Sequence, residues 1–179
     1  SVENTYVGRG RLERKAFYGL SGEAVVTPEG YASIEYGYDL YGQLIEVSFH
    51  GLDGELVTGT EGYAIVRSAY DGSGNLTETG YHDEAGQLVI VPGLSYAQVR
   101  YTYDPQGYLV AEAYYSPEGQ YIINDEGFAL ARYALDEQGN VLSERFYDTN
   151  ESPVMTTRGY AALIQTYGAY SVVLSREYL

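Results

Sequence analysis

Few side-chain types in this sequence could carry out catalysis or bind a metal ion. The chain has no cysteine and only two histidines, His50 and His82, so acid–base chemistry would depend on its 25 Asp and Glu residues. Paired carboxylates can hydrolyse glycosides, and carboxylate-rich loops can bind calcium. No loop here has the spaced Asp, Asn and Glu ligands of a calcium loop, and no phosphate-binding or nucleophile motif is present. We therefore predict no catalytic residue, no metal site and no cofactor.

Tyrosine is the residue type best suited to bind something, with 22 copies and no tryptophan. Its apolar ring and polar hydroxyl suit both half-buried strands and contact surfaces. Tyr41, Tyr108 and Tyr121 stand at places where other copies of an internal repeat carry polar or small residues. We therefore predict that these three side chains are exposed and that they form the ligand-binding surface.

The elements that position these residues recur along the chain. An aromatic residue followed by alanine appears at spacings of 32, 33, 32 and 32 residues. Such periodicity is typical of repeat proteins, so we predict a single array over residues 1–179. The aromatic–alanine pairs are Tyr31-Ala32, Tyr63-Ala64, Tyr96-Ala97, Phe128-Ala129 and Tyr160-Ala161. The predicted repeats are 1–30 (partial), 31–62, 63–95, 96–127, 128–159 and a degenerate C-terminal cap at 160–179.

Each repeat has the pattern of a β-hairpin. Counting from the aromatic residue, even positions two to eight are mostly apolar, which indicates a strand with one buried face. An Asp-x-x-Gly turn follows at positions nine to twelve, and it predicts a bulged hairpin that pairs position eight with position fourteen, as in Tyr38 with Leu44. A second glycine turn and a short apolar stretch predict a third short strand. The predicted class is an all-β tandem array, solenoid-like or an extended meander.

Positions one and nineteen form two rows of aromatic residues. The hairpin register predicts that the rows lie together, on the face opposite to positions eight and fourteen. They could form a core between repeats or a contact surface, and the sequence favours the core. The rows contain Tyr31, Phe49, Tyr63, Tyr81, Tyr96, Tyr114, Phe128, Phe146, Tyr160 and Tyr178.

Both histidines occupy position twenty of their repeats. Other repeats have Tyr115, Tyr147 or Leu179 at this position. A position that accepts tyrosine and leucine is structural, so we predict that His50 and His82 are neither metal ligands nor acid–base groups.

Charge and hydropathy argue against a nucleic-acid partner and against a membrane span in this segment. The formal net charge is −15, which would repel a phosphate backbone, so nucleic acid is not expected as a partner. No apolar run approaches the roughly 18 to 20 residues of a membrane-spanning segment. The chain begins with Ser1, and we interpret it as a mature or excised piece of a longer protein.

The turn residues resemble the Tyr-Asp repeats of RHS and YD type found in large bacterial surface and secreted proteins. The matching segments are Tyr38-Asp39 with Gly42-Gln43-Leu44, Tyr70-Asp71 with Gly74-Asn75-Leu76, Tyr103-Asp104 with Gly107-Tyr108-Leu109, and Leu135-Asp136 with Gly139-Asn140-Val141. Tandem aromatic hairpins are also similar to the wall-binding repeats of Gram-positive surface proteins, although those use tryptophan. Both resemblances imply a bacterial protein that is exported, with an extracellular or cell-surface location.

These observations favour a non-catalytic extracellular repeat module that binds a glycan or a protein through aromatic side chains, because sugar faces stack on such rings. A structural spacer or stalk that presents another domain is the alternative. A glycoside hydrolase or an enzyme accessory domain is a third reading, since carboxylate geometry is invisible in sequence.

Overall fold

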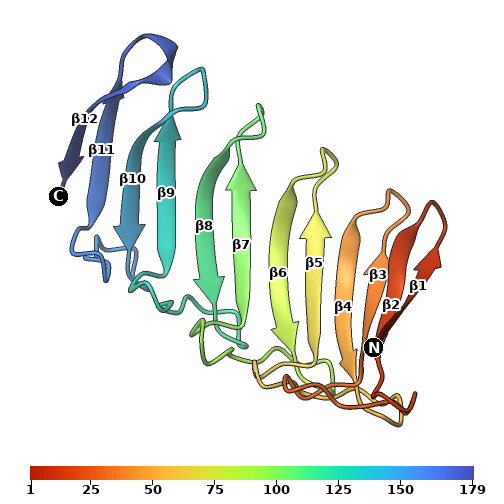
Figure 1. Ribbon diagram of the computed structural model, residues 1–179. Coiled ribbons are helices and arrows are strands. Elements are labelled where there is room, and N and C mark those ends of the chain that lie inside the picture. The colour runs from red at the N-terminus through yellow and green to blue at the C-terminus, as the bar shows by residue number, and fades with distance from the viewer. The chain divides into compact units, whose positions relative to one another are not determined.

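The computed structural model describes residues 1–179 and divides into an N-terminal unit, Ser1–Gly93, and a C-terminal unit, Leu94–Leu179. Within each unit antiparallel strands follow one another in chain order, as predicted for an all-β repeat array (Figure 1). The first unit contains β1 (Val2–Val7), β2 (Arg11–Phe17), β3 (Ser33–Tyr38), β4 (Leu44–His50), β5 (Ile65–Tyr70) and β6 (Leu76–His82). The second contains β7 (Gln98–Tyr103), β8 (Leu109–Tyr115), β9 (Leu130–Leu135), β10 (Val141–Tyr147), β11 (Ala162–Tyr167) and β12 (Val173–Tyr178). A 3-10 turn, Ala169–Ser171, is the one helical element, and no helix has the length and apolarity of a membrane span.

The Asp-x-x-Gly turns close the hairpins as predicted. Between β3 and β4, the Gly42 amide donates to the Asp39 carbonyl, while Asp39 Oδ1 accepts from the amides of Tyr41 and Gln43. Gly42 has φ of 91°, a left-handed conformation that costs glycine little. The turn produces a bulge, and its register confirms the predicted pairing of Tyr38 with Leu44.

Backbone pairing between neighbouring hairpins is much shorter than pairing within them. Strands β4 and β5 share three residue pairs, from Glu46 opposite Arg67 to Ser48 opposite Ile65, whereas β3 and β4 share six. All three pairs lie toward the long loops. Backbone pairing therefore leaves the turn ends of adjacent hairpins unconnected.

Tyrosine hydroxyl groups connect these turn ends. The Tyr70 hydroxyl donates to the Leu44 carbonyl of the preceding hairpin at 3.1 Å, and Tyr38 donates to the Leu12 carbonyl at 2.9 Å. In the C-terminal unit Tyr167 makes the same bond to Val141 at 3.0 Å. Position eight therefore ties each of these hairpins to the one before it, which explains why tyrosine recurs there. Leu135 occupies position eight of its repeat and has no hydroxyl to donate.

The long loops contain two further turns of the same kind. In the long loop after β4 they run from Gly51 to Glu55 and from Gly59 to Tyr63. Because two tight turns leave so few residues between them, the predicted third strand is wrong: the segment makes only an isolated bridge, such as that of His50 with Leu56. Each turn is closed by a residue with positive φ. Ser95 (φ 67°) and Glu151 (φ 58°) occupy this position where other repeats have glycine.

The two aromatic rows form a ladder of packed rings. Ring centroids are 4.7 Å apart for Tyr31 and Phe49 and 5.8 Å for Phe49 and Tyr63, with similar spacing along each unit. The prediction that they lie opposite to positions eight and fourteen is wrong. Phe49 lies opposite Ile34 in the pairing of β3 with β4. Ile34 and Tyr38 are four residues apart in β3, so strand alternation places both on the same face. Phe49 therefore shares a face with Tyr38.

The ladder is the core, as the sequence favoured. Phe128 and Phe146 are 2% and 1% exposed, and they pack with Val99, Tyr114 and Ala131 in the C-terminal unit. Tilted aromatic pairs at these distances stabilise a fold beyond their buried area. These buried rings are therefore committed to packing, whereas Tyr178 at the C-terminal end of the ladder is 56% exposed.

We call the hydrogen bond from the position-eight tyrosine to the preceding hairpin the tyrosine tether. It can be tested by removing one such bond and by adding one. We expect Tyr70→Phe to lower the free energy of unfolding by about 1 kcal/mol, since it leaves the Leu44 carbonyl without this donor. We expect Leu135→Tyr to raise it by up to about 1 kcal/mol by supplying the hydroxyl to the Leu109 carbonyl. Urea denaturation measures both, and equal stability of Tyr70→Phe and the parent would contradict the tether.

Two substitutions test the left-handed turn position. Gly74 has φ of 90°, so Gly74→Ala should cost about 1 kcal/mol. Ser95→Gly should stabilise by about 0.5 to 1 kcal/mol, because it relieves the same conformation. Gly72 lies in the Gly74 turn without positive φ, and Gly72→Ala is the matched control with little expected change. Thermal and urea unfolding measure the stability of the three variants. Equal stability of Gly74→Ala and Gly72→Ala would contradict a required left-handed conformation at position 74.

Candidate functional site

Tyr41 lies at the tip of the β3–β4 turn and is 92% exposed, as predicted. Its neighbour Leu40 is 103% exposed, and the sequence analysis did not identify it as a candidate contact residue. Comparison of the repeats could have identified it, because the equivalent residue is Gly72 in the next repeat and Pro105 in the one after. The β3–β4 turn thus places two adjacent large apolar side chains in solvent.

An open groove runs between the β3–β4 turn and the β5–β6 turn. Its volume is about 530 Å³. The groove exists here because backbone pairing between β4 and β5 is confined to the opposite end of the strands. Its lining residues are Asp39, Tyr41, Gln43, Tyr70, Asp71, Gly72, Ser73 and Gly74.

The two carboxylates of the groove have different environments. In the second turn the Asn75 side-chain amide donates to Asp71 Oδ2 at 2.9 Å, and hydrogen bonds from Asn75 hold the pKa of Asp71 below its usual value. In the first turn both amide donors reach Asp39 Oδ1. Gln43 replaces the asparagine there, so Asp39 Oδ2 keeps its capacity to accept a further hydrogen bond.

Tyr108 occupies the corresponding groove of the C-terminal unit, between the β7–β8 and β9–β10 turns. This groove is smaller, about 340 Å³, and is also lined by Asp104 and Asp136. The Tyr108 ring lies against Gly139, so close that a Cβ at that glycine would be 2.5 Å from a ring carbon. Tyr108 is accordingly half-buried rather than exposed as predicted, because it packs on the backbone of the next turn.

Tyr121 lies at the other end of β8, in the long loop. It makes an isolated bridge with Tyr115, and the two ring centroids are 5.2 Å apart. Burial, followed by the charge of Tyr115, raises the pKa of Tyr121. Tyr121 is half-buried, again contrary to the predicted exposure, because its ring packs on Tyr115. Tyr108 and Tyr121 flank opposite ends of one strand, so the C-terminal unit does not bring them together.

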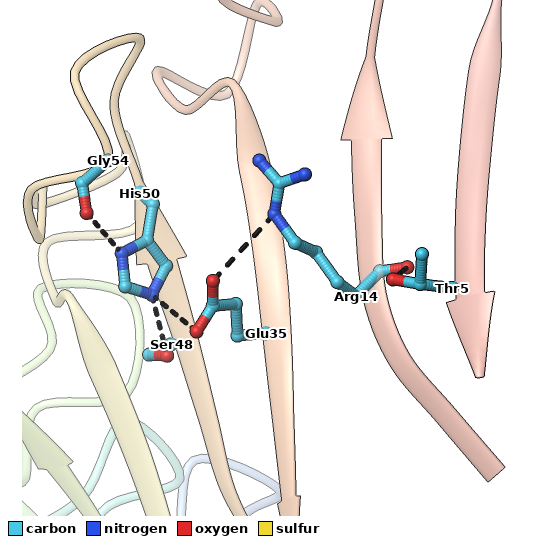
Figure 2. Close-up of polar contacts among 6 residues, drawn as sticks. All are labelled: Thr5, Arg14, Glu35, Ser48, His50 and Gly54. Atoms are coloured by element: carbon cyan, nitrogen blue, oxygen red, sulfur yellow. Dashed lines mark hydrogen bonds and ion pairs between the residues drawn. The ribbon is translucent and has the colours of Figure 1, made fainter. Parts of the chain in front are cut away.

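His50 is the centre of a polar cluster on β3 and β4 (Figure 2). Its Nδ1 lies 2.9 Å from the Gly54 carbonyl, an acceptor, so Nδ1 carries a proton. In the neutral ring Nε2 therefore accepts from the Ser48 hydroxyl at 2.9 Å, and Glu35 lies 3.7 Å from the same nitrogen. Arg14 approaches the other oxygen of Glu35 at 3.7 Å.

This serine–histidine contact has the hydrogen-bond direction of a nucleophile and its base. However, Ser48 is only 7% exposed, which denies a substrate access to the hydroxyl. The contact with Gly54 ties the strand to the following turn, which is a structural role. His82 differs: burial and then the charge of Arg67 hold its pKa below the usual value, so it is neutral at pH 7.

No three His, Asp or Glu side chains of the chain converge on a metal-sized site. Each turn aspartate accepts hydrogen bonds from backbone amides of its own turn, as Asp71 and Asp104 do. The arrangement of the groove therefore suits recognition of another molecule by shape, apolar contact and hydrogen bonding.

No protein-family model and no curated protein matches the chain. Three of the solved structures that match the chain are the following. A crystal structure of TcdB2-TccC3-TEV is 15% identical, with 96% of this chain and 8% of that chain covered and a TM-score of 0.57. A TcdB2-TccC3 crystal structure without its hypervariable C-terminal region is 19% identical over 96% of this chain and 9% of that chain, with a TM-score of 0.40. A structure of the Tc holotoxin pore of Photorhabdus luminescens is 18% identical over 93% of this chain and 8% of that chain, with a TM-score of 0.37.

The chain thus spans less than a tenth of the length of the chains it matches. At these identities the likeness concerns fold alone, and the TcdB2-TccC3-TEV structure carries it. That fold is consistent with the resemblance of the turns to Tyr-Asp repeats. The chain has the β-hairpin repeat fold of a segment of TcdB2-TccC3.

Proposed function

We propose that the chain is a non-catalytic structural module of a secreted or surface-exposed bacterial protein, in which consecutive hairpins build a framework outside the cell. The observation that carries this proposal is the tyrosine tether, as in Tyr70 to Leu44. It recurs at the repeat period and joins each such hairpin to its predecessor, which is what an extending framework requires. A bond that recurs at Tyr38, Tyr70 and Tyr167 serves architecture more directly than it serves a single active site.

Two further observations support the structural role. The aromatic ladder forms the core of the C-terminal unit, where Tyr114, Phe128 and Phe146 are buried. The chain corresponds to 8% of a TcdB2-TccC3-TEV chain of similar fold, which supports a place within a much larger toxin or surface protein.

Removal of one whole repeat tests the framework. Deleting residues 31–62 joins Gly30 to Tyr63 in phase and brings the Tyr70 hydroxyl to the Leu12 carbonyl, so a shorter folded protein of reduced stability should result. Deleting only residues 31–46 breaks the phase and should prevent folding. Circular dichroism and urea denaturation distinguish these results, and an unfolded product from the in-phase deletion would argue against the structural module.

A contact role is the second candidate function, and the exposure of Tyr41 favours it. A ring that is 92% exposed contributes nothing to packing, yet it is suited to stack on a sugar or to enter a protein interface. The half-buried Tyr108 and Tyr121 contribute less ring surface to such a contact. Binding to a glycan or a protein would add to the framework role without replacing it.

Replacement of the three tyrosines separates contact from architecture. Tyr41→Ser alone should leave thermal stability within about 0.5 kcal/mol, since exposed positions tolerate substitution. The triple variant with Tyr108→Ser and Tyr121→Ser should lose about 1 kcal/mol or more, because their rings are packed. Titration with bacterial wall fragments and host glycans then measures binding, and a glycan that binds all variants equally would exclude these tyrosines as its contact.

A further inference from the structure

The β3–β4 turn departs from the other turns at the two positions that the fold leaves free. Its central residues are Leu40 and Tyr41, whereas the later repeats carry Gly72-Ser73, Pro105-Gln106 and Glu137-Gln138. All hydrogen bonds that close the turn involve the backbone or Asp39. The fold therefore has no use for two large apolar side chains here.

Two large apolar side chains side by side form a contact surface that packing within the fold does not use. Leu40 and Tyr41 are 103% and 92% exposed, next to each other at the tip of one hairpin. Tyrosine is among the residues that dominate protein interfaces, and apolar tips with adjacent pockets anchor partners. We call Leu40 and Tyr41 the apolar tip.

The groove beside the apolar tip supplies the polar half of a recognition site. Asp39 and Asp71 are its only charged lining residues. The Arg11 guanidinium lies beside Gly42 and over the Tyr38 ring, 5.0 Å from its centroid, and Arg11 is not among the residues that line the groove. Asp39 Oδ2 is directed to no turn amide and can accept a hydrogen bond from a ligand.

We propose that the apolar tip and this groove bind a basic, apolar peptide segment of a partner protein, with apolar side chains against Leu40 and Tyr41 and a Lys or Arg at Asp39. This inference rests on the second candidate function and names its partner class. Leu40 offers a sugar no stacking face, which favours a peptide over a glycan. The net charge of −15 opposes an anionic membrane and attracts a cationic segment.

The experiment uses the intact chain and a short synthetic peptide made of Lys and Leu, with a Glu and Leu peptide of equal length for comparison. Isothermal titration calorimetry measures affinity for the parent and for the double variant Leu40→Ser with Tyr41→Ser. The matched control is Leu20→Ser with Leu52→Ser, which removes exposed leucines from the long-loop end of the same unit. Circular dichroism and thermal melts verify that both variants are folded.

We expect the Lys and Leu peptide to bind the parent and the matched control alike, and the tip variant at least tenfold more weakly. Binding should fall as salt rises, and the Glu and Leu peptide should not bind. Absence of binding to the parent at millimolar peptide, or an equal loss in both variants, overturns the proposal.

Neutral oligosaccharides and phosphatidylcholine vesicles with or without phosphatidylserine form the remaining arms. If a saccharide or a vesicle binds through the apolar tip and the peptide does not, the partner class is wrong while the contact role stands. If neither the peptide, the saccharides nor the vesicles lose affinity in the tip variant, the contact role fails with it. The structural role is judged separately, by the in-phase deletion.

Discussion

The hydrogen bond from a tyrosine hydroxyl to the backbone carbonyl of the preceding hairpin is the interaction on which the array depends. Backbone pairing joins neighbouring hairpins over three residue pairs at one end only. Tyr38, Tyr70 and Tyr167 each reach across the other end. The two residues of the Tyr-Asp pair therefore have separate roles: the tyrosine acts between hairpins, and the aspartate closes the turn within one.

The same geometry explains where the molecule can recognise another one. Where strands are paired along their full length, side chains fill the surface, but the turn ends of β4 and β5 stay apart and leave the groove between Asp39 and Asp71. The side chains at the turn tips make none of the hydrogen bonds that close the turn, because the aspartate and the glycine close it by themselves. Sequence variation at the tips thus changes what the surface presents without changing the framework.

Much of the fold could be predicted because strand alternation and turn chemistry are local. The pairing of Tyr38 with Leu44 follows from Asp39 and Gly42 alone. The prediction of a third strand was wrong because the tight turns on either side of Leu56 leave too few residues for strand pairing. This limit depends on both turns together, so the pattern of one segment does not reveal it. The exposure of Tyr41 was correct, whereas the burial of Tyr108 against Gly139 joins residues of different repeats, which a count of columns does not reveal.

The leucine at position eight of the repeat 128–159 shows how the array tolerates variation. Strands β8 and β9 pair from Ala111 to Ala113 with Leu130 to Arg132, as other neighbouring hairpins do, and Leu135 adds no hydroxyl bond near the turns. Two other contacts join the same hairpins: Tyr133 donates a hydrogen bond to Glu112 at 2.9 Å, and the Tyr108 ring packs on Gly139. The array can therefore exchange one kind of connection for another at a single interface, which gives its repeats room to diverge in sequence.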